Sequence, residues 1–237
     1  MTAVLETIME KPANANEVAM LVTPSRTALH PPAERYEKYV QLLASTKSIL
    51  QGHFELQDLQ HSNHFLKFAR IAAHEQYASE MADDIHELLG EIRPTRVFGP
   101  VHAGGLLVPA MSRKYGVKPG YFDISDVHFR PTNVRYGYEL TEGDRVLLVN
   151  DMNATGTSIR YMAQLVRGFG YCTQVVGIAV FATRGEAGLN TLEDMAKRMQ
   201  IPSTALVHLN MPAYPAKSCQ LCSTSTPRNI FSMSLNS

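Results

Sequence analysis

Between Arg145 and Ser158 the chain reads Arg-Val-Leu-Leu-Val-Asn-Asp-Met-Asn-Ala-Thr-Gly-Thr-Ser. The apolar run after Arg145 predicts a buried strand, which carries Asn150 and Asp151 to its carboxyl end. Open α/β sheets bind their ligands at that edge. A short Thr/Gly loop follows and leads directly into a helical pattern of apolar residues. The stretch therefore predicts an α/β fold with a ligand site at a strand-to-helix junction.

The loop of this stretch has the chemistry of a phosphate site. The first amides of a helix have no partner within the helix, and an anion can accept their hydrogen bonds. Hydroxyls of Thr155, Thr157 and Ser158 add donors, and Gly156 lets the backbone turn tightly. Ser and Thr are also common helix caps, so an ordinary capped turn is the alternative. The combination of strand, acid, loop and helix favours phosphate binding.

Apolar spacing elsewhere extends this α/β pattern. Helical spacing occurs at 33–50, 69–89, 104–115 and 159–169, and short apolar runs at 97–98, 121–124, 146–149, 175–181 and 205–207 predict strands. Strands rich in Val, Ile and Leu that alternate with helices predict a mostly parallel sheet flanked by helices. Residues 48–67 break the helical period and predict a small N-terminal hood. Residues 1–33 contain four prolines and predict an arm, which leaves 34–237 as the main domain.

Composition narrows the class of function. The 22 basic and 22 acidic side chains balance, which argues against binding to nucleic acid or an anionic membrane surface. No apolar stretch approaches the roughly 18 residues of a membrane span. The N-terminus lacks a basic leader, and three cysteines are too few for a disulfide framework. These features predict a cytoplasmic protein.

The stretch from Val149 to Ser158 resembles the phosphoribosyl diphosphate (PRPP) motif of type I phosphoribosyltransferases. That resemblance implies that the loop holds the 5′-phosphate of PRPP and that Asn150 and Asp151 face the ribose hydroxyls. The loop residues are Ala154, Thr155, Gly156, Thr157 and Ser158. The family usually has two acids where this chain has Asn150 and Asp151. Asp151 is thus the one acid of this pair, and it is expected to orient the ribose hydroxyls and the water ligands of a Mg²⁺ ion bound with PRPP.

A second segment, 97–105, resembles the family's pyrophosphate loop. It reads Val-Phe-Gly-Pro-Val-His-Ala-Gly-Gly and lies between a predicted strand and a predicted helix. Backbone amides near Ala103, Gly104 and Gly105 are expected to meet pyrophosphate oxygens, with His102 nearby. Without the stronger motif, this Gly-Gly would be read as a tight structural turn.

Two further segments resemble the orotate branch of the family. Gly52 to Phe65 matches its hood, with Phe54 expected near the base, although Asp58 and Leu59 replace the usual Ser-Gly. Arg184 follows a predicted strand and is expected to contact a carbonyl or carboxylate of the base, because its planar donors suit an oxygen-rich ring. The alternative for the hood is a strand and turn that pack over the sheet without contacting the base. The alternative for Arg184 is a solvated surface residue.

The segment 126–138 lies where the family has a mobile catalytic loop. It contains His128, Arg130 and Arg135 but no lysine. Arginine can stabilise pyrophosphate charge and histidine can donate a proton, so these three join Asp151 as candidate catalytic residues. A surface connection with incidental charge is an equally weighted alternative.

Cys219 and Cys222 form a Cys-x-x-Cys pair near the C-terminus. Such a pair can be half of a zinc site, but no second pair follows it. The histidines at 53, 61, 64 and 74 are scattered and do not form an evident ligand set in the sequence. A non-metal, structural role is therefore the favoured interpretation of the pair.

Taken with the resemblance, these features predict an enzyme that moves ribose 5-phosphate from PRPP to a nitrogen of a planar base, orotate or a related one. Magnesium is the implied cofactor, and a homodimer is the implied assembly. Asp58 and Leu59 replace the usual Ser-Gly of the orotate branch, and Thr183 replaces its usual acid. These three differences favour a base other than orotate. Asn150 and the lysine-free loop favour a different class, a PRPP-binding regulatory protein with little catalysis.

Overall fold

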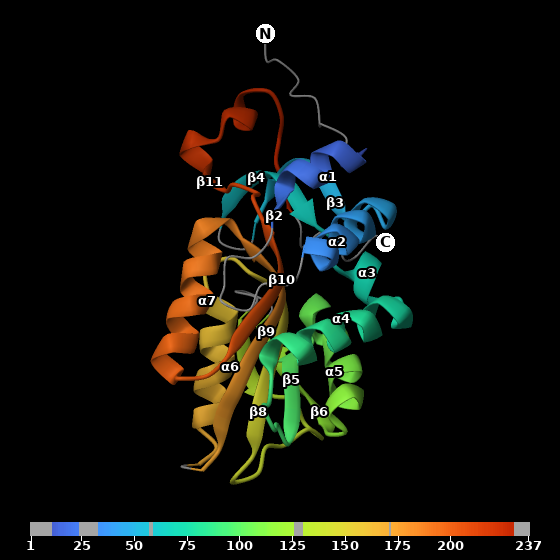
Figure 1. The fold of residues 1–237 in the computed structure, drawn as a ribbon. Coiled ribbons are helices and arrows are strands. Elements are labelled where there is room, and N and C mark those ends of the chain that lie inside the picture. The colour runs from blue at the N-terminus through green and yellow to red at the C-terminus, as the bar shows by residue number, and fades with distance from the viewer. Residues whose placement is uncertain (1–10, 24–32, 57–58, 126–129, 171, 230–237) are drawn as a thin grey trace.

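The computed structural model describes residues 11–23, 33–56, 59–125, 130–170 and 172–229. A large and a small β-sheet form within these residues (Figure 1). The strands of the large sheet are β2 (Val22–Thr23), β5 (Arg96–Pro100), β6 (Lys118–Ile124), β7 (Pro131–Val134), β8 (Arg145–Asn153), β9 (Gln174–Arg184) and β10 (Ser203–Leu209). They lie in the order β2-β10-β9-β8-β5-β6-β7.

The strands β10, β9, β8, β5 and β6 run parallel to their neighbours, whereas β2 and β7 pair antiparallel at the two edges. From β5 the chain moves outward to β6, and from β8 it moves the other way to β9 and β10. The strand order thus reverses between β5 and β8. In open α/β sheets, ligands bind at the carboxyl ends of the strands beside such a reversal.

Helices cover both faces of the large sheet (Figure 1). Helices α2 (Ala33–Ser45), α4 (Glu75–Leu89) and α5 (Leu107–Tyr115) contribute to the core of one face, and α6 (Thr157–Arg167) and α7 (Gly185–Met199) to that of the other. The short helices α1 (Ala15–Leu21) and α3 (Ala69–Ala72) pack against α2 and α4, respectively. Leu147 and Val149 of β8 belong to the core shared with α4 and α5, and Val146 and Leu148 to the core shared with α6 and α7. This alternation is that of a strand buried on both faces, and the predicted fold class is confirmed.

The hood is the small sheet, centred on the hairpin of β3 (Ile49–Glu55) and β4 (Gln60–Leu66). Three two-residue strands extend it: β1 (Lys11–Pro12), β11 (Tyr214–Pro215) and β12 (Arg228–Asn229). The 3-10 helices η2 (Ala216–Ser218) and η3 (Gln220–Ser223) lie between β11 and β12. The C-terminal segment, residues 214–229, therefore pairs first with β4 and then with β3.

The described part of the predicted arm is folded onto both sheets. Strand β1 pairs with the hood and β2 with β10, and α1 lies between them. Asn14 caps α1 in a reciprocal arrangement with Glu17, and Val18 and Val22 are fully buried. These pieces are too short to show a period in the sequence. The predicted boundary near residue 33 stays a prediction, since 24–32 lie outside the described residues.

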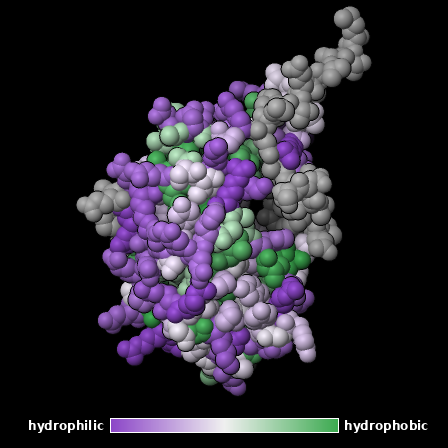
Figure 2. Space-filling model, turned by 90° about the vertical axis from the view of Figure 1, so that its right-hand side faces the viewer, coloured by the Kyte–Doolittle hydropathy of each residue, from purple (hydrophilic) through white to green (hydrophobic). Residues whose placement is uncertain are grey.

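Most predicted elements occur close to their expected places. The predicted helix over 69–89 is interrupted between α3 and α4 and ends at Gly90, whose φ of 65° suits glycine. The predicted helix over 33–50 ends earlier, because the chain enters β3 at Ile49. The face that bears α4 and α5 is mostly hydrophilic, with small apolar areas (Figure 2). Among the described residues, no helix combines the length and apolarity that a membrane span requires.

Candidate active site

The loop after β8 forms a cradle at the start of α6. Gly156 is the N-cap residue and has φ of 73°, a left-handed conformation that glycine adopts without strain. A Cβ atom there would lie 2.3 Å from Cγ2 of Thr191 on α7. Because the cap has no side chain, no cap side chain occupies the first amides of α6. The hydroxyls of Thr155 and Thr157 lie 2.9 Å apart at the same point.

The charge at this cradle suits an anion. The first turn of α6 has no acidic residue. Arg160 donates from Nη2 to the carbonyl oxygen of Thr155 at 3.3 Å, which holds a guanidinium beside the loop. The helix dipole adds positive potential at the same end. Arg160 is not predicted from the sequence, although its place one turn into the helix after a phosphate loop is a usable signal.

Asn150 and Asp151 lie near the carboxyl end of β8. Asn150 is buried and donates from Nδ2 to the carbonyl oxygen of Met152 at 3.2 Å. Burial raises the pKa of Asp151 to about 6, against hydrogen bonds from the amides of Met152 and Asp151 that lower it. The carboxylate is costly to ionise here without a partner, so a cation or a hydroxyl donor that binds it lowers the free energy of the site.

The predicted pyrophosphate loop packs directly on these two residues. It follows β5 and contains the 3-10 helix η1 (Ala103–Leu106). A Cβ atom at Gly104 would lie 2.2 Å from Oδ1 of Asn150 and 2.8 Å from the amide nitrogen of Asp151. Only glycine permits this approach. The structure thus brings the two predicted loops together where the strand order reverses.

Arg184 is a buried residue at the end of β9, and its donors meet the hood. Nη2 lies 2.6 Å from Oγ of Ser62 and 3.4 Å from the carbonyl oxygen of His64. Nε donates to the carbonyl oxygen of Met211 at 2.9 Å. The residue is therefore not a solvated surface arginine. Its expected contact with a base stays a prediction.

Phe54 is completely buried in the core of the hood, with its ring centroid 5.8 Å from that of Phe65. Leu59, at the tip of the hairpin, is 70% exposed and has φ of 60°. Glycine adopts this conformation with less strain than leucine does. Asp58 lies outside the described residues.

The three candidate catalytic residues of the segment 126–138 do not lie in one described loop. Arg130 and Arg135 flank β7, and both are exposed. Arg130 donates to the hydroxyl of Tyr161 on α6 at 3.0 Å, whereas Arg135 pairs with Asp123 at 2.9 Å. His128 lies outside the described residues. The roles of all three stay predictions.

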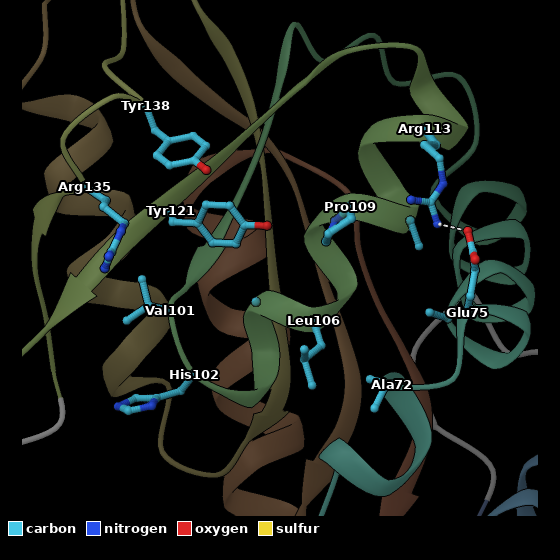
Figure 3. A pocket seen from close by; sticks show the side chains of 14 residues that line it. Ala72, Glu75, Val101, His102, Leu106, Pro109, Arg113, Tyr121, Arg135 and Tyr138 are labelled. Carbon is cyan, nitrogen blue, oxygen red and sulfur yellow. Dashed lines mark ion pairs between the residues drawn. The ribbon is translucent and has the colours of Figure 1, made fainter.

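A cavity of about 740 Å³ lies beside the pyrophosphate loop (Figure 3). Val101, His102 and Gly105 line it, together with Tyr121, Tyr138 and Arg135. The two tyrosine rings meet edge to face, with centroids 5.0 Å apart. Residues 150–158 are not among the described residues that line it, so this cavity borders the predicted PRPP site without containing it.

Residues 67–205 match the phosphoribosyl transferase domain family. The chain belongs to this family. The match runs from the end of the hood hairpin into β10 and includes both loops described above. Most of the hood and the C-terminal segment lie outside it.

Individual relatives share the orotate name. The orotate phosphoribosyltransferase of Caldanaerobacter subterraneus subsp. tengcongensis is 27% identical over 191 residues, which is 81% of this chain and 94% of that protein. The solved orotate phosphoribosyltransferase of Aeropyrum pernix is 25% identical, with a TM-score of 0.54, over 70% of this chain and 91% of that chain. The UMP synthase of Leishmania donovani shares the fold, with 20% identity and a TM-score of 0.60, over 75% of this chain and 37% of that chain.

Proposed function

We propose that this protein transfers ribose 5-phosphate from PRPP to a ring nitrogen of an orotate-type base and releases pyrophosphate. The observation that carries the proposal is the close approach of Gly104 to Asn150 and Asp151. It brings the predicted phosphate loop and the predicted pyrophosphate loop together where the strand order reverses. Membership of the phosphoribosyl transferase domain family and relatives named orotate phosphoribosyltransferase support the same reaction. Those names give no support to the regulatory alternative.

In the proposed reaction, the bond from C1′ to the pyrophosphate oxygen breaks and a bond from C1′ to the base nitrogen forms. The proton of that nitrogen leaves to the departing pyrophosphate or to water. The amides and hydroxyls of 154–158 hold the 5′-phosphate at the start of α6. Asp151 accepts hydrogen bonds from the ribose hydroxyls and so orients the sugar. The amides of 103–105 stabilise the charge that develops on the departing pyrophosphate. Positioning and charge stabilisation are the main demands of such a step.

Magnesium fits the donors at this site. Asp151 provides a half-buried carboxylate whose ionisation is opposed by burial, and a cation removes that cost. Asn150 brings no negative charge, so Asp151 is the residue of this pair that suits a hard cation. The ion would be held through Asp151, the ribose hydroxyls and water, and it would neutralise part of the pyrophosphate charge.

The remaining parts of the proposal concern the base, the assembly and the compartment. Arg184 is expected to orient the base from beneath the hood, alone or through Ser62. Pairing into a homodimer is expected from the family. A cytoplasmic location is expected, because three cysteines are too few for a disulfide framework.

The first test is a calorimetric titration of PRPP with and without Mg²⁺, followed by a pyrophosphate release assay with orotate, uracil, adenine and hypoxanthine. Binding together with release on adding orotate is the expected result. Release with a different base alone would correct the substrate, and binding without release for any base would support a regulator. The absence of binding would contradict the assignment of 150–158.

A further inference from the structure

Four side chains that are far apart in the sequence converge beside the hood hairpin. They are His53 of β3, His61 of β4, and Cys219 and Cys222 around η3. One nitrogen or sulfur atom from each lies within 4.8 Å of all the others. His53, His61 and Cys219 are at most 9% exposed, and Cys222 is half-buried. None of these residues has a part in the proposed reaction.

Four of the six separations between these atoms are 3.1–3.8 Å, close to those of a tetrahedral metal site. Nε2 of His53 lies 3.1 Å from Nδ1 of His61, 3.4 Å from Sγ of Cys219 and 3.8 Å from Sγ of Cys222. Nδ1 of His61 lies 3.1 Å from Sγ of Cys222. With Zn–N bonds of about 2.0 Å and Zn–S bonds of about 2.3 Å, tetrahedral ligand atoms lie about 3.3–3.8 Å apart.

The hydrogen bonds around His53 orient it as a metal ligand. Its Nδ1 lies 3.1 Å from the carbonyl oxygen of Ser225 and 2.9 Å from the Ser225 hydroxyl. A carbonyl oxygen only accepts, so Nδ1 carries the proton and donates it there. Nε2 then has a free lone pair directed at the cluster. Metal-bound histidines commonly show this arrangement, with the second ring nitrogen donating to a carbonyl oxygen.

We propose that His53, His61, Cys219 and Cys222 bind one structural Zn²⁺ ion. Two imidazole nitrogens and two thiolates in tetrahedral array favour zinc over magnesium or calcium, which prefer oxygen ligands. Protein ligands fill all four positions, as in structural rather than catalytic zinc sites. The Cys-x-x-Cys spacing is also usual for structural zinc. The sequence alone favours a non-metal role because no second cysteine pair follows. The proposed partners are histidines on a hairpin that is distant in the sequence.

The ion would fasten the C-terminal segment to the hood. Strand β12 pairs with β3 just beyond the cluster, with Arg228 opposite Phe54. His61 directly precedes Ser62, which accepts a hydrogen bond from Arg184 and donates one to the carbonyl oxygen of Pro212. The zinc site therefore supports the part of the hood that touches the carboxyl edge of the large sheet. This inference does not depend on which base the protein uses.

A disulfide between Cys219 and Cys222 is the competing state of the same residues. It would use both sulfurs and leave the two imidazoles facing each other at 3.1 Å, where at most one hydrogen bond can form between them. A bound cation satisfies both nitrogens and both sulfurs at once. The two states differ in metal content and in mass, so they can be separated experimentally.

The test is the metal content of the full chain, purified under reducing conditions without a histidine tag and dialysed against Zn²⁺ and then against metal-free buffer. Elemental mass spectrometry is expected to find one zinc per chain. Replacement of zinc by Co²⁺ is expected to give the intense visible absorption of tetrahedral cobalt and a thiolate-to-cobalt charge-transfer band. Folded wild-type protein with no bound zinc, or with a Cys219–Cys222 disulfide, would overturn the proposal.

Variants identify the ligands. Cys219→Ser and Cys222→Ser are each expected to lower zinc content to below about a tenth of the wild-type value, because the thiolates are ligands. Cys172→Ser and His74→Asn alter an exposed cysteine and an exposed histidine, and both are expected to keep the zinc. Equal zinc loss in a control and a ligand variant would contradict the assignment. If a ligand variant does not fold, the cobalt spectrum of the wild type still decides whether thiolates bind the metal.

Discussion

Nη2 of Arg184 donates to Oγ of Ser62 at 2.6 Å, which joins the end of β9 to the hood across 122 residues of sequence. Both side chains are buried. Ser62 in turn donates a hydrogen bond from Oγ to the carbonyl oxygen of Pro212 at 2.8 Å. The guanidinium is thereby held at the carboxyl edge of the large sheet. The position of the hood and the position of this arginine depend on each other.

Ser62→Ala is expected to raise the KM for the base more than the KM for PRPP. Arg184 loses one hydrogen-bond acceptor, whereas the loops at 103–105 and 154–158 are unchanged. Stability should fall by about 1–3 kcal/mol, since a buried charged donor loses a partner. Steady-state kinetics with each substrate varied in turn, together with urea unfolding, measure both effects. Ser79→Ala on α4 changes an exposed serine and serves as the control. A larger change in the KM for PRPP would argue against a role for Arg184 at the base.

Gly104→Ala is expected to weaken PRPP binding at least about tenfold, because the new methyl group would meet Oδ1 of Asn150 and push the two loops apart. Gly168→Ala is the matched control. Its Cβ would have no neighbour closer than 3.4 Å, and the residue has φ of −69°. Calorimetric titration of each variant measures the affinity. Unchanged affinity in Gly104→Ala would show that the approach of the loops is not needed for PRPP.

Because of Asp151, rising pH is expected to lower the stability of the free protein and to raise its affinity for PRPP. Burial raises the pKa of Asp151 from 3.8 to about 6, so its unfavourable ionisation lowers stability as pH rises between these values. Asp151→Asn should therefore stabilise the free protein at neutral pH, by about 1–3 kcal/mol. PRPP with magnesium needs the ionised form, so wild-type affinity should fall as pH drops below about 6.

The measurement is the affinity for PRPP with Mg²⁺ against pH, in wild type and in Asp151→Asn. PRPP itself titrates in this range, so the difference between the two proteins carries the result. We expect the variant to bind more weakly near neutral pH and the gap to close as pH falls. Parallel curves at all pH values would show that Asp151 does not bind as a carboxylate.

The parts of the site that could be predicted from the sequence are those with a local pattern. The apolar run of β8, the Gly-Gly loop after β5 and the Thr/Gly loop after β8 each lie within a few residues, and the roles expected of the two loops come from the resemblance to the family. Helix α7 is not predicted, although Leu189, Leu192 and Ala196 have helical spacing. Only a base contact at Arg184, just before this helix, is predicted from the sequence.

The parts that could not be predicted depend on contacts between distant segments. His61 and Cys222 are 161 residues apart, and only the pairing of the C-terminal segment with the hood brings them together. Strand β2 has two residues and owes its place to β10, so no period in the sequence indicates it. The packing of Gly104 on Asn150 likewise follows from strand order rather than from either loop alone.

Asp144 is expected to stabilise the fold at the end of β8 opposite the site. Burial alone would raise the pKa of this carboxyl, but hydrogen bonds from the amide and hydroxyl of Thr141 and from Thr95, with Arg96 nearby, lower it. A lowered pKa contributes stability that is present above about 3.8 and is lost as pH falls through the folded value. Asp144→Asn should cost about 1–3 kcal/mol near neutral pH. Urea unfolding of both proteins should show this difference shrinking in acid, and a constant difference would contradict the argument.

Leu59 places a branched residue in a left-handed conformation at the tip of the hood hairpin. Its amide donates to the carbonyl oxygen of Leu56 at 3.0 Å, so the turn holds the residue there, and the side chain is too exposed to gain much from packing. A non-glycine residue in this region costs about 1–2 kcal/mol, whereas glycine loses about 0.5–1 kcal/mol through its freer unfolded chain. Leu59→Gly is therefore expected to raise stability by up to about 1 kcal/mol. Thermal and urea unfolding measure the change, with Gly116→Leu as the reverse substitution at a left-handed helix cap, expected to destabilise. A clear loss of stability in Leu59→Gly would show that the exposed leucine has a packing partner in solution.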